Sequence, residues 1–136
     1  MILSSEKVVV FMEKAAKRSG TPEGFRESLK KATTEMLVLF LLRRRPMYTY
    51  EMMNEIEALS QGVITFNTLY LTIHRLQDFG YVEEQGKVVS EDNRVRLYFA
   101  ITPKGEKYLN DLIREYRRYT GTVNQILGLT EGGKGA

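Results

Sequence analysis

Apolar side chains return every three or four residues in four separate stretches of this chain, a spacing typical of amphipathic helices. The stretches cover residues 5–18, roughly 28–44, 48–59 and 67–79. In the second stretch the apolar positions cover a wide face, which predicts a helix at the centre of the core. Gly80 follows the fourth stretch directly, at the position where a glycine commonly ends a helix.

Short polar signals indicate where these helices begin and end. Ser19-Gly20-Thr21-Pro22 combines a glycine stop with a threonine cap and a first-turn proline. Arg43-Arg44-Arg45 closes the second helix before Pro46. We interpret this run as positive charge placed favourably at a helix C-terminus, and contact with phosphate is the alternative. In the first stretch, Val8-Val9-Val10 leaves a strand possible because β-branched residues are stiff in helices.

The third and fourth helices each have one face that we expect to be buried. In the third helix it consists of Tyr50, Met53, Ile56 and Leu59. In the fourth helix the inward residues are Leu69, Ile73 and Leu76, spaced by four and three. The opposite face of that helix carries Thr68, Leu71, His74, Arg75 and Asp78. Several of these side chains are of the kinds that reach base edges or phosphates.

Two stretches with a strand pattern follow, at residues 81–89 and 94–101, on either side of the turn-forming residues 90–93. The second stretch alternates strictly between apolar and polar positions. Val95, Leu97, Phe99 and Ile101 point one way, and Arg94, Arg96 and Tyr98 point the other. Two arginines therefore lie next to the tip of a predicted hairpin, and Lys87 is on the facing strand.

The last helix is predicted to begin at Thr102-Pro103, a cap followed by a first-turn proline. Its apolar residues step alternately by three and four, like the seam of a coiled coil. They are Leu109, Leu112, Tyr116, Tyr119, Val123 and Ile126. We interpret the seam as a dimer interface, the alternative being a helix that folds back onto its own domain. We expect Gly121 to bend or end the helix and residues 130–136 to be disordered.

A short helix followed by a basic-tipped hairpin is the layout of a winged helix, in which the helix enters a DNA groove and the hairpin lies along the backbone. A net charge of +3 is compatible with DNA without requiring it. The absence of cysteine removes disulfides, thiolate metal sites and cysteine nucleophiles, and it fits a reducing cytoplasm. Since no apolar run has the length of a membrane span, we expect a cytoplasmic protein with no membrane partner.

The polar residues form no pattern that indicates catalysis or metal binding. His74 is the only histidine, so a histidine-based metal cluster cannot form. Glu83 and Glu84 are neighbours on a predicted strand, so their carboxylates point to opposite faces. The tail has Gly128 and Gly133-Lys134 at the spacing of a phosphate-binding loop, but position 135 is Gly rather than Ser or Thr, and we interpret the match as chance. We therefore predict no enzyme activity and no cofactor.

Several motifs occur in an order and spacing that together indicate a family. They are Leu37-Val38-Leu39-Phe40-Leu41-Leu42, Arg45-Pro46-Met47-Tyr48-Thr49-Tyr50-Glu51, Thr68-Leu69-Tyr70, Arg75-Leu76, Phe79-Gly80-Tyr81-Val82 and Arg96-Leu97-Tyr98-Phe99-Ala100-Ile101-Thr102-Pro103-Lys104-Gly105. Through them, residues 33–127 resemble the PadR-like family of winged-helix transcription regulators. Two sites depart from the family pattern. Thr49 stands where a glycine is usual, and Phe66-Asn67 stands where Pro-Gly usually opens the recognition helix.

The resemblance implies a homodimer that binds a roughly palindromic operator and usually represses transcription. In some members, a small aromatic or cationic effector bound between the subunits releases the DNA. The tryptophan that some of these effector pockets use has no counterpart, since the chain contains no Trp. The sequence leaves open whether this chain has an effector and which operator it reads.

We therefore predict a mainly α chain with a small β-hairpin (α+β). Its fold is a winged helix-turn-helix with an extra N-terminal helix and a long C-terminal dimerisation helix. The predicted parts are an N-terminal extension at 1–28, the DNA-binding domain at 29–101, the dimerisation helix at 102–128 and a tail at 129–136.

The expected contacts with double-stranded DNA are Asn67, Thr68, Tyr70, His74 and Arg75 on the recognition helix and Lys87, Arg94 and Arg96 on the wing. The expected dimer contacts are the six seam residues. The alternative is a protein–protein interaction module on the same fold that does not bind DNA. Leu71 favours that alternative, because it is an apolar residue on the outer helix face.

Overall fold

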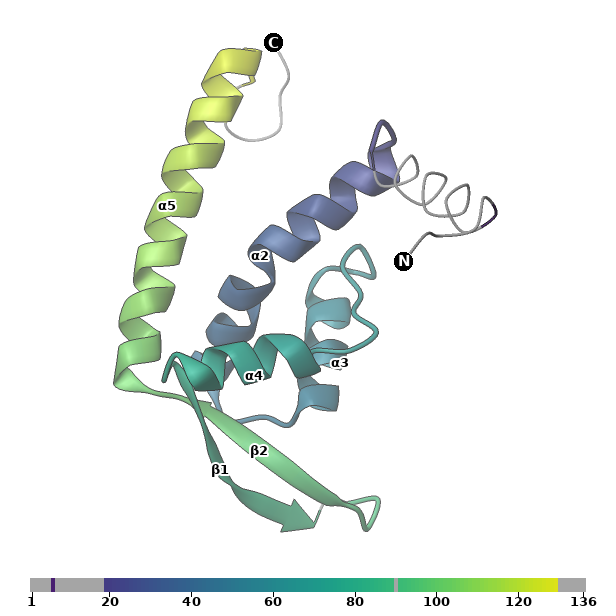
Figure 1. Cartoon of the computed structure of the whole chain (residues 1–136), viewed down its shortest axis with the longest axis vertical. Coiled ribbons are helices and arrows are strands. Elements are labelled where there is room, and N and C mark those ends of the chain that lie inside the picture. Colours follow the sequence, from purple (N-terminus) through teal and green to yellow (C-terminus); the bar gives the residue numbers. More distant parts are fainter. Residues whose placement is uncertain (1–5, 7–18, 90, 130–136) are drawn as a thin grey trace. The chain divides into compact units, whose positions relative to one another are not determined.

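The computed structural model describes residue 6 and residues 19–89 and 91–129 (Figure 1). The helix predicted at 5–18, apart from Glu6, and the tail predicted at 130–136 lie outside these residues. The chain forms two compact parts, residues 1–34 and residues 35–136. The functional boundaries expected after residues 28, 101 and 128 stay predictions.

Helix α2 runs from Pro22 to Arg44, so the start predicted near residue 28 was wrong. The capping sequence sets the true start, because Thr21 Oγ1 accepts a hydrogen bond from the Gly24 N–H at 3.0 Å. Pro22 fits the first turn, where no intrahelical partner is needed for its nitrogen. Residues 22–28 contain one large apolar side chain, Phe25, so apolar periodicity could not reveal the first turns.

Helix α3 runs from Thr49 to Leu59, as predicted within one residue, but its buried face differs from the predicted one. Met52 and Ile56 are buried, whereas Tyr50 is 53% exposed and Leu59 is 58% exposed. The prediction joined residues at successive steps of three. Each such step turns back by about 60° on a helix with 3.6 residues per turn, so the two ends of the series cannot both face the core.

Helix α4 runs from Tyr70 to Asp78 and therefore begins three residues after the predicted start at Asn67. Thr68 Oγ1 accepts a hydrogen bond from the Tyr70 N–H at 3.2 Å, a local contact that competes with helix formation. At the other end Gly80 adopts φ +79, as a helix-ending glycine does. The Tyr81 N–H donates to Leu76 O at 2.9 Å and completes this C-terminal cap.

Strands β1, Val82–Val89, and β2, Val95–Ile101, form an antiparallel hairpin close to the predicted positions. A bulge between Glu84 and Gly86 shifts the pairing by one residue on β1. On its other side β2 makes an isolated bridge from Phe99 to Met47, with hydrogen bonds of 2.9 and 3.1 Å. The bridge joins the hairpin to the segment between α2 and α3.

Helix α5 runs from Pro103 to Leu127 and ends at Gly128, which has φ +72. Thr102 caps it through a hydrogen bond that Thr102 Oγ1 accepts from the Gly105 N–H at 3.0 Å. The helix continues through Gly121, so the possibility that it ends there was wrong. A glycine lowers helix propensity by about 1 kcal/mol, and the flanking turns outweigh this amount. The later turns of α5 project away from α3, α4 and the hairpin (Figure 1).

One apolar core unites these elements. Its buried members come from the second half of α2, from α3, α4, the hairpin and the start of α5. They are Val38, Leu39, Leu41, Leu42, Met47, Met52, Ile56, Leu69, Ile73, Leu76, Val82, Phe99 and Leu109. The arrangement confirms the predicted fold class, a mainly helical winged helix-turn-helix with α3 and α4 as the helix pair and the β1–β2 hairpin as the wing.

Candidate nucleic-acid interface

The outer face of α4 combines aromatic and polar side chains with one leucine. Tyr70 is 64% exposed, Leu71 is 71% exposed, and His74 is exposed one turn after Tyr70. The rings of Tyr70 and His74 meet edge to face with centroids 4.3 Å apart. Asn67 and Thr68 are also exposed, but they lie in the loop before the helix. The structure thus brings these predicted contact residues together around the first half of α4.

Arg75 lies at the border between the outer face of α4 and the core. Its Nη1 is 3.5 Å from Glu35 Oε2, and 57% of its side chain is exposed. Glu35 Oε1 accepts a hydrogen bond from the Tyr108 hydroxyl at 2.8 Å. Burial, together with this bond to Glu35, raises the pKa of Tyr108 to about 12, so its hydroxyl stays a donor at neutral pH. A polar chain through Glu35 therefore joins α4 to α2 and α5.

The three basic residues predicted on the wing point in different directions. The register pairs Lys87 with Leu97 and Val88 with Arg96, and paired residues lie on the same side of an antiparallel ladder. Lys87 and Arg96 therefore lie on opposite faces of the hairpin. Arg94 precedes β2 at the tip, with 74% of its side chain exposed and its Nε 3.8 Å from Asp92.

Arg96 is held against the start of α3. Its side chain is 22% exposed, and its Nη2 is 2.7 Å from Asp92 Oδ2. Its guanidinium carbon lies 4.9 Å from the centre of the Tyr48 ring, within the range of a cation–π contact. Its Nε is buried and has no hydrogen-bond partner among the described residues. These contacts give Arg96 a role in placing the wing, and its contact with DNA stays a prediction.

A hollow of about 570 Å³ separates the wing tip from the start of α3. Its lining residues are Tyr48, Tyr50, Glu51, Val89, Glu91, Asp92, Arg96 and Tyr98. Carboxylates outnumber guanidinium groups in this lining, so the interior of the hollow disfavours a phosphate. Lys87 and Arg94 do not line this hollow.

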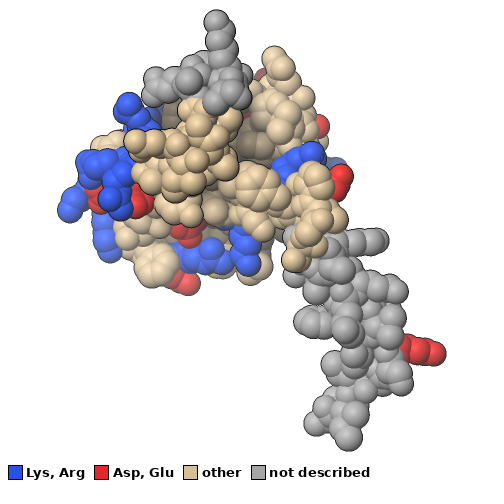
Figure 2. All heavy atoms as spheres, turned by 90° about the horizontal axis from the view of Figure 1, so that it is seen from above, with Lys and Arg blue, Asp and Glu red and all other residues tan. Residues whose placement is uncertain are grey.

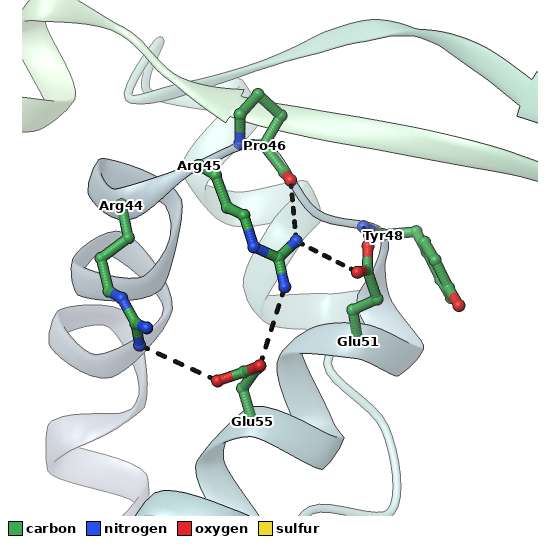
Figure 3. Close-up of polar contacts among 6 residues, drawn as sticks. All are labelled: Arg44, Arg45, Pro46, Tyr48, Glu51 and Glu55. Atoms are coloured by element: carbon green, nitrogen blue, oxygen red, sulfur yellow. Dashed lines mark hydrogen bonds and ion pairs between the residues drawn. The ribbon is translucent and has the colours of Figure 1, made fainter.

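The arginines at the end of α2 bind carboxylates of α3 (Figure 3). Arg45 lies 3.1 Å from Glu51 and 3.7 Å from Glu55, and Arg44 lies 3.8 Å from Glu55. Glu51 also accepts a hydrogen bond from the Tyr48 N–H at 3.3 Å. These contacts hold the end of α2 against α3, which supports the interpretation of the run as structural charge.

The predicted dimer seam divides into a buried and an exposed half. Leu109 is fully buried in the core of its own chain, and Leu112 packs against that core. Tyr116, Tyr119 and Ile126 are 47%, 69% and 79% exposed. The first half of the seam therefore anchors α5 to its own domain, and only the second half presents apolar surface to a partner.

Basic and acidic side chains alternate on the one face of the described residues that Figure 2 shows. On the face shown in Figure 2, Lys and Arg gather in separate groups with Asp and Glu beside them. This pattern agrees with the ion pairs above and with the modest net charge of +3.

Sequence reasoning missed Glu35, Tyr108 and Asp92. Glu35 stands three and four residues before the buried Val38 and Leu39, so helical spacing places a carboxylate on the core face of α2. This spacing could have identified Glu35 from the sequence. Tyr108 is distant in sequence, and the role of Asp92 depends on how the hairpin tip folds, so no local pattern could pair either of them.

Comparison with known proteins gives consistent results. The model of the transcriptional regulator PadR-like family matches residues 38–111, more than half of the chain. A transcriptional regulator from Clostridium thermocellum is 25% identical, with a TM-score of 0.65 over 72% of this chain and 96% of that one. No curated protein matches significantly. Among the described residues, no helix has the length and apolar character needed to cross a membrane.

Two further solved structures share the fold. A PadR family transcriptional regulator from Eggerthella lenta is 24% identical, with a TM-score of 0.65, and the match covers 79% of this chain and 93% of that one. A PadR-like transcriptional regulator from Bacillus cereus is 22% identical, with a TM-score of 0.62 and coverage of 74% and 96%. At these identities the likeness establishes the fold and nothing further.

Proposed function

The chain belongs to the PadR-like family of transcriptional regulators, and from that premise we propose that it is a repressor that binds double-stranded DNA sequence-specifically as a homodimer. Regulators of this family are not enzymes. The observation that carries the proposal is α4, which is anchored in the core on one side and exposes Tyr70 and His74 on the other. A helix held in this way can enter the major groove. We propose that the protein acts in the cytoplasm.

In this proposal the first half of α4 reads the groove. Tyr70, His74 and Arg75 contact DNA from the helix, and Asn67 and Thr68 do so from the preceding loop. Asn and Arg have the amide and guanidinium groups that pair with adenine and guanine in the major groove. Tyrosine and threonine hydroxyls suit phosphate oxygens. The exposure of all five side chains supports this assignment.

The wing adds contacts that do not depend on sequence. Arg94 at the tip and Lys87 on β1 bind phosphates, and Arg96 contributes by holding the wing next to α3. Each phosphate contact releases counterions, so these residues set the salt dependence of binding more than its base preference. The 74% exposure of the Arg94 side chain supports its assignment.

The second half of α5 forms the dimer interface in this proposal. Tyr116, Tyr119, Val123 and Ile126 continue the three-four spacing beyond the point where the helix leaves its own core. A two-fold pair of such helices buries these side chains and places two copies of α4 on adjacent half-sites. A symmetric protein requires a roughly palindromic operator, with half-sites one helical turn or a multiple of it apart.

For regulation we propose a small aromatic or cationic effector bound between the subunits. Tyr116 and Tyr119 are the groups that support this, because tyrosine rings stack on aromatic compounds and attract cations. Binding there changes the angle between the two α5 helices and with it the spacing of the two α4 helices, which releases the operator.

Selection from genomic DNA tests the whole proposal. Fragments are bound at increasing salt, and the bound fraction is sequenced. We expect enrichment of one inverted repeat with half-sites about one helical turn apart. Weak, salt-sensitive binding without an enriched sequence would contradict sequence-specific recognition.

Replacement of Arg94 by alanine tests the wing. Because one phosphate contact is lost, we expect weaker binding to all duplexes and a salt slope that is smaller by about one unit. Arg114→Ala is the matched control, since its side chain on α5 is also 74% exposed and the change of charge is the same. An equal slope change in both variants would show that net charge, and not the wing, is responsible.

A second candidate function is protein docking without DNA binding, which the 71% exposure of Leu71 favours. An apolar side chain at the centre of the outer face suits a protein partner better than a phosphate. Leu71→Lys separates the two functions. The added charge strengthens binding to DNA, whereas it abolishes docking to an apolar protein surface.

A further inference from the structure

The contact between Arg75 and Glu35 leaves part of the guanidinium available. Arginine carries five N–H donors in a fixed planar fork. Glu35 lies 3.5 Å from Nη1, and more than half of the Arg75 side chain is exposed. Within the described residues, the edge formed by Nε and Nη2 can therefore face outward. An edge with two parallel donors matches the O6 and N7 acceptors of guanine.

Glu35 is itself held in place. Its side chain is 23% exposed, and each of its oxygens has a partner, Tyr108 on one side and Arg75 on the other. The Tyr108 ring stacks on Tyr81 with centroids 4.2 Å apart and an angle of 13° between the planes. The Lys104 ammonium lies over the Tyr81 ring, 5.3 Å from its centre. The carboxylate therefore has little freedom to rotate.

We propose that Glu35 and Tyr108 are positioning residues that hold Arg75 in the orientation in which it contacts one guanine in each half-site. This inference rests on the proposed DNA-binding function and names a base that the recognition helix selects. An arginine side chain has many rotamers, and a contact that orders it before binding reduces the entropy lost in the complex. The carboxylate thus acts on DNA only through Arg75.

The charges of the pair predict which property it controls. Arg75 and Glu35 neutralise each other at long range, so together they add little to general attraction for phosphates. Arg94 at the wing tip differs, because its effect is a change in salt slope. For Arg75 and Glu35 we therefore expect an effect on base preference with little effect on the salt slope.

Two substitutions separate positioning from folding. Glu35→Gln retains an oxygen that accepts the Tyr108 hydrogen bond but removes the charge that holds Arg75. Tyr108→Phe retains the ring stacked on Tyr81 but removes the donor to Glu35. Glu55→Gln is the control, because it also removes the charge of a carboxylate paired with arginine, at the corner between α2 and α3.

The experiment uses the full chain and a set of duplexes. One duplex carries the sequence enriched by the wild-type protein, and each of the others has one guanine replaced. Arg75→Ala should lose about tenfold or more of the discrimination at one position. Glu35→Gln should lose several-fold at that same position, and Tyr108→Phe should lose less. Affinity for mixed-sequence DNA should not fall in Glu35→Gln, and Glu55→Gln should keep full discrimination.

The other outcomes overturn the inference. If Arg75→Ala relaxes one position and Glu35→Gln does not, Arg75 reads the base without help, and the proposed function stands. If Glu35→Gln lowers only the unfolding temperature, its role is structural. If both variants weaken binding equally on every duplex, Arg75 contacts the backbone. If the wild-type protein enriches no sequence, the proposed function and this inference fail together.

Discussion

Gly105, in the first turn of α5, lies directly against the backbone of Tyr81, which connects α4 to β1. A Cβ atom added there would be 2.1 Å from Tyr81 O and 2.9 Å from Ile101 Cγ1. Ordinary contacts of a Cβ begin at 3.4 Å. In Gly105→Ala the two backbones must therefore move apart by about 1.3 Å, and the movement strains the hydrogen bond from the Thr102 N–H to Tyr81 O, now 3.0 Å. A backbone carbonyl cannot rotate away as the end of a flexible side chain can.

The free energy of unfolding should fall because the clash outweighs the gain in helix propensity. Overpacking costs about 1–3 kcal/mol, and a strained hydrogen bond adds up to about 1 kcal/mol. Replacing glycine by alanine in a helix returns at most about 1 kcal/mol, less in a first turn. We expect Gly105→Ala to be less stable by about 1–3 kcal/mol, which lowers Tm by roughly 4–12 °C in a domain of this size.

Gly121→Ala is the matched control in the same helix. Among the described residues nothing lies within 4 Å of its added Cβ, so only the gain in propensity of about 0.5–1 kcal/mol applies. The measurement is urea unfolding followed by circular dichroism, at one fixed protein concentration because a dimer adds stability by mass action. The reasoning would be refuted if Gly105→Ala were as stable as the wild type. It would also be refuted if the stabilities of both variants shifted in the same direction.

Three further predictions concern single contacts. Since the pKa of Tyr108 is raised from 10.0 to about 12, its contribution to stability is complete below pH 10 and is lost as pH rises to about 12. Between pH 10 and pH 12, the urea midpoint of Tyr108→Phe should therefore decline less than that of the wild-type protein. Asp92→Asn removes the charge that binds Arg96 at 2.7 Å, so affinity for mixed-sequence DNA should rise up to about tenfold in a filter-binding assay. An unchanged affinity would show that the charge of Asp92 does not limit the contact of the wing with DNA. Thr102→Ala loses the cap of α5, so its free energy of unfolding should be lower by about 1–2 kcal/mol, whereas Thr102→Ser should retain most of the stability.

Local patterns in the sequence predicted the elements well. The Thr102-Pro103 cap predicted the start of α5 and Gly80 predicted the end of α4, because those signals act through hydrogen bonds a few residues apart. The buried residues Leu69, Ile73 and Leu76 were predicted correctly, since a short amphipathic helix has one apolar face. The start of α2 was missed although the Thr21-Pro22 cap was recognised, because the predicted start followed the apolar spacing, which is weak in the first turns.

The directions of the wing residues could not be predicted from alternation alone. The bulge between Glu84 and Gly86 places Lys87 on the face opposite to Arg96, and a single extra residue reverses every side chain beyond it. Such a bulge depends on how the two strands meet. The bond between Glu35 and Tyr108 is likewise a tertiary contact. The part of the candidate interface that sequence could give was therefore the outer face of α4, and the side chains that hold it had to come from the structure.

If two protomers pair through the exposed second half of α5 as proposed, helix formation and pairing are one equilibrium. From Tyr116 onward the helix has mostly exposed apolar side chains and contains Gly121. Isolated helical segments of this length are marginal in water. In a single protomer the last turns should therefore fray, and a partner helix should order them. In the proposed homodimer the helical content per chain then rises with protein concentration, and the amount of protein in the cell determines how many chains have a rigid α5.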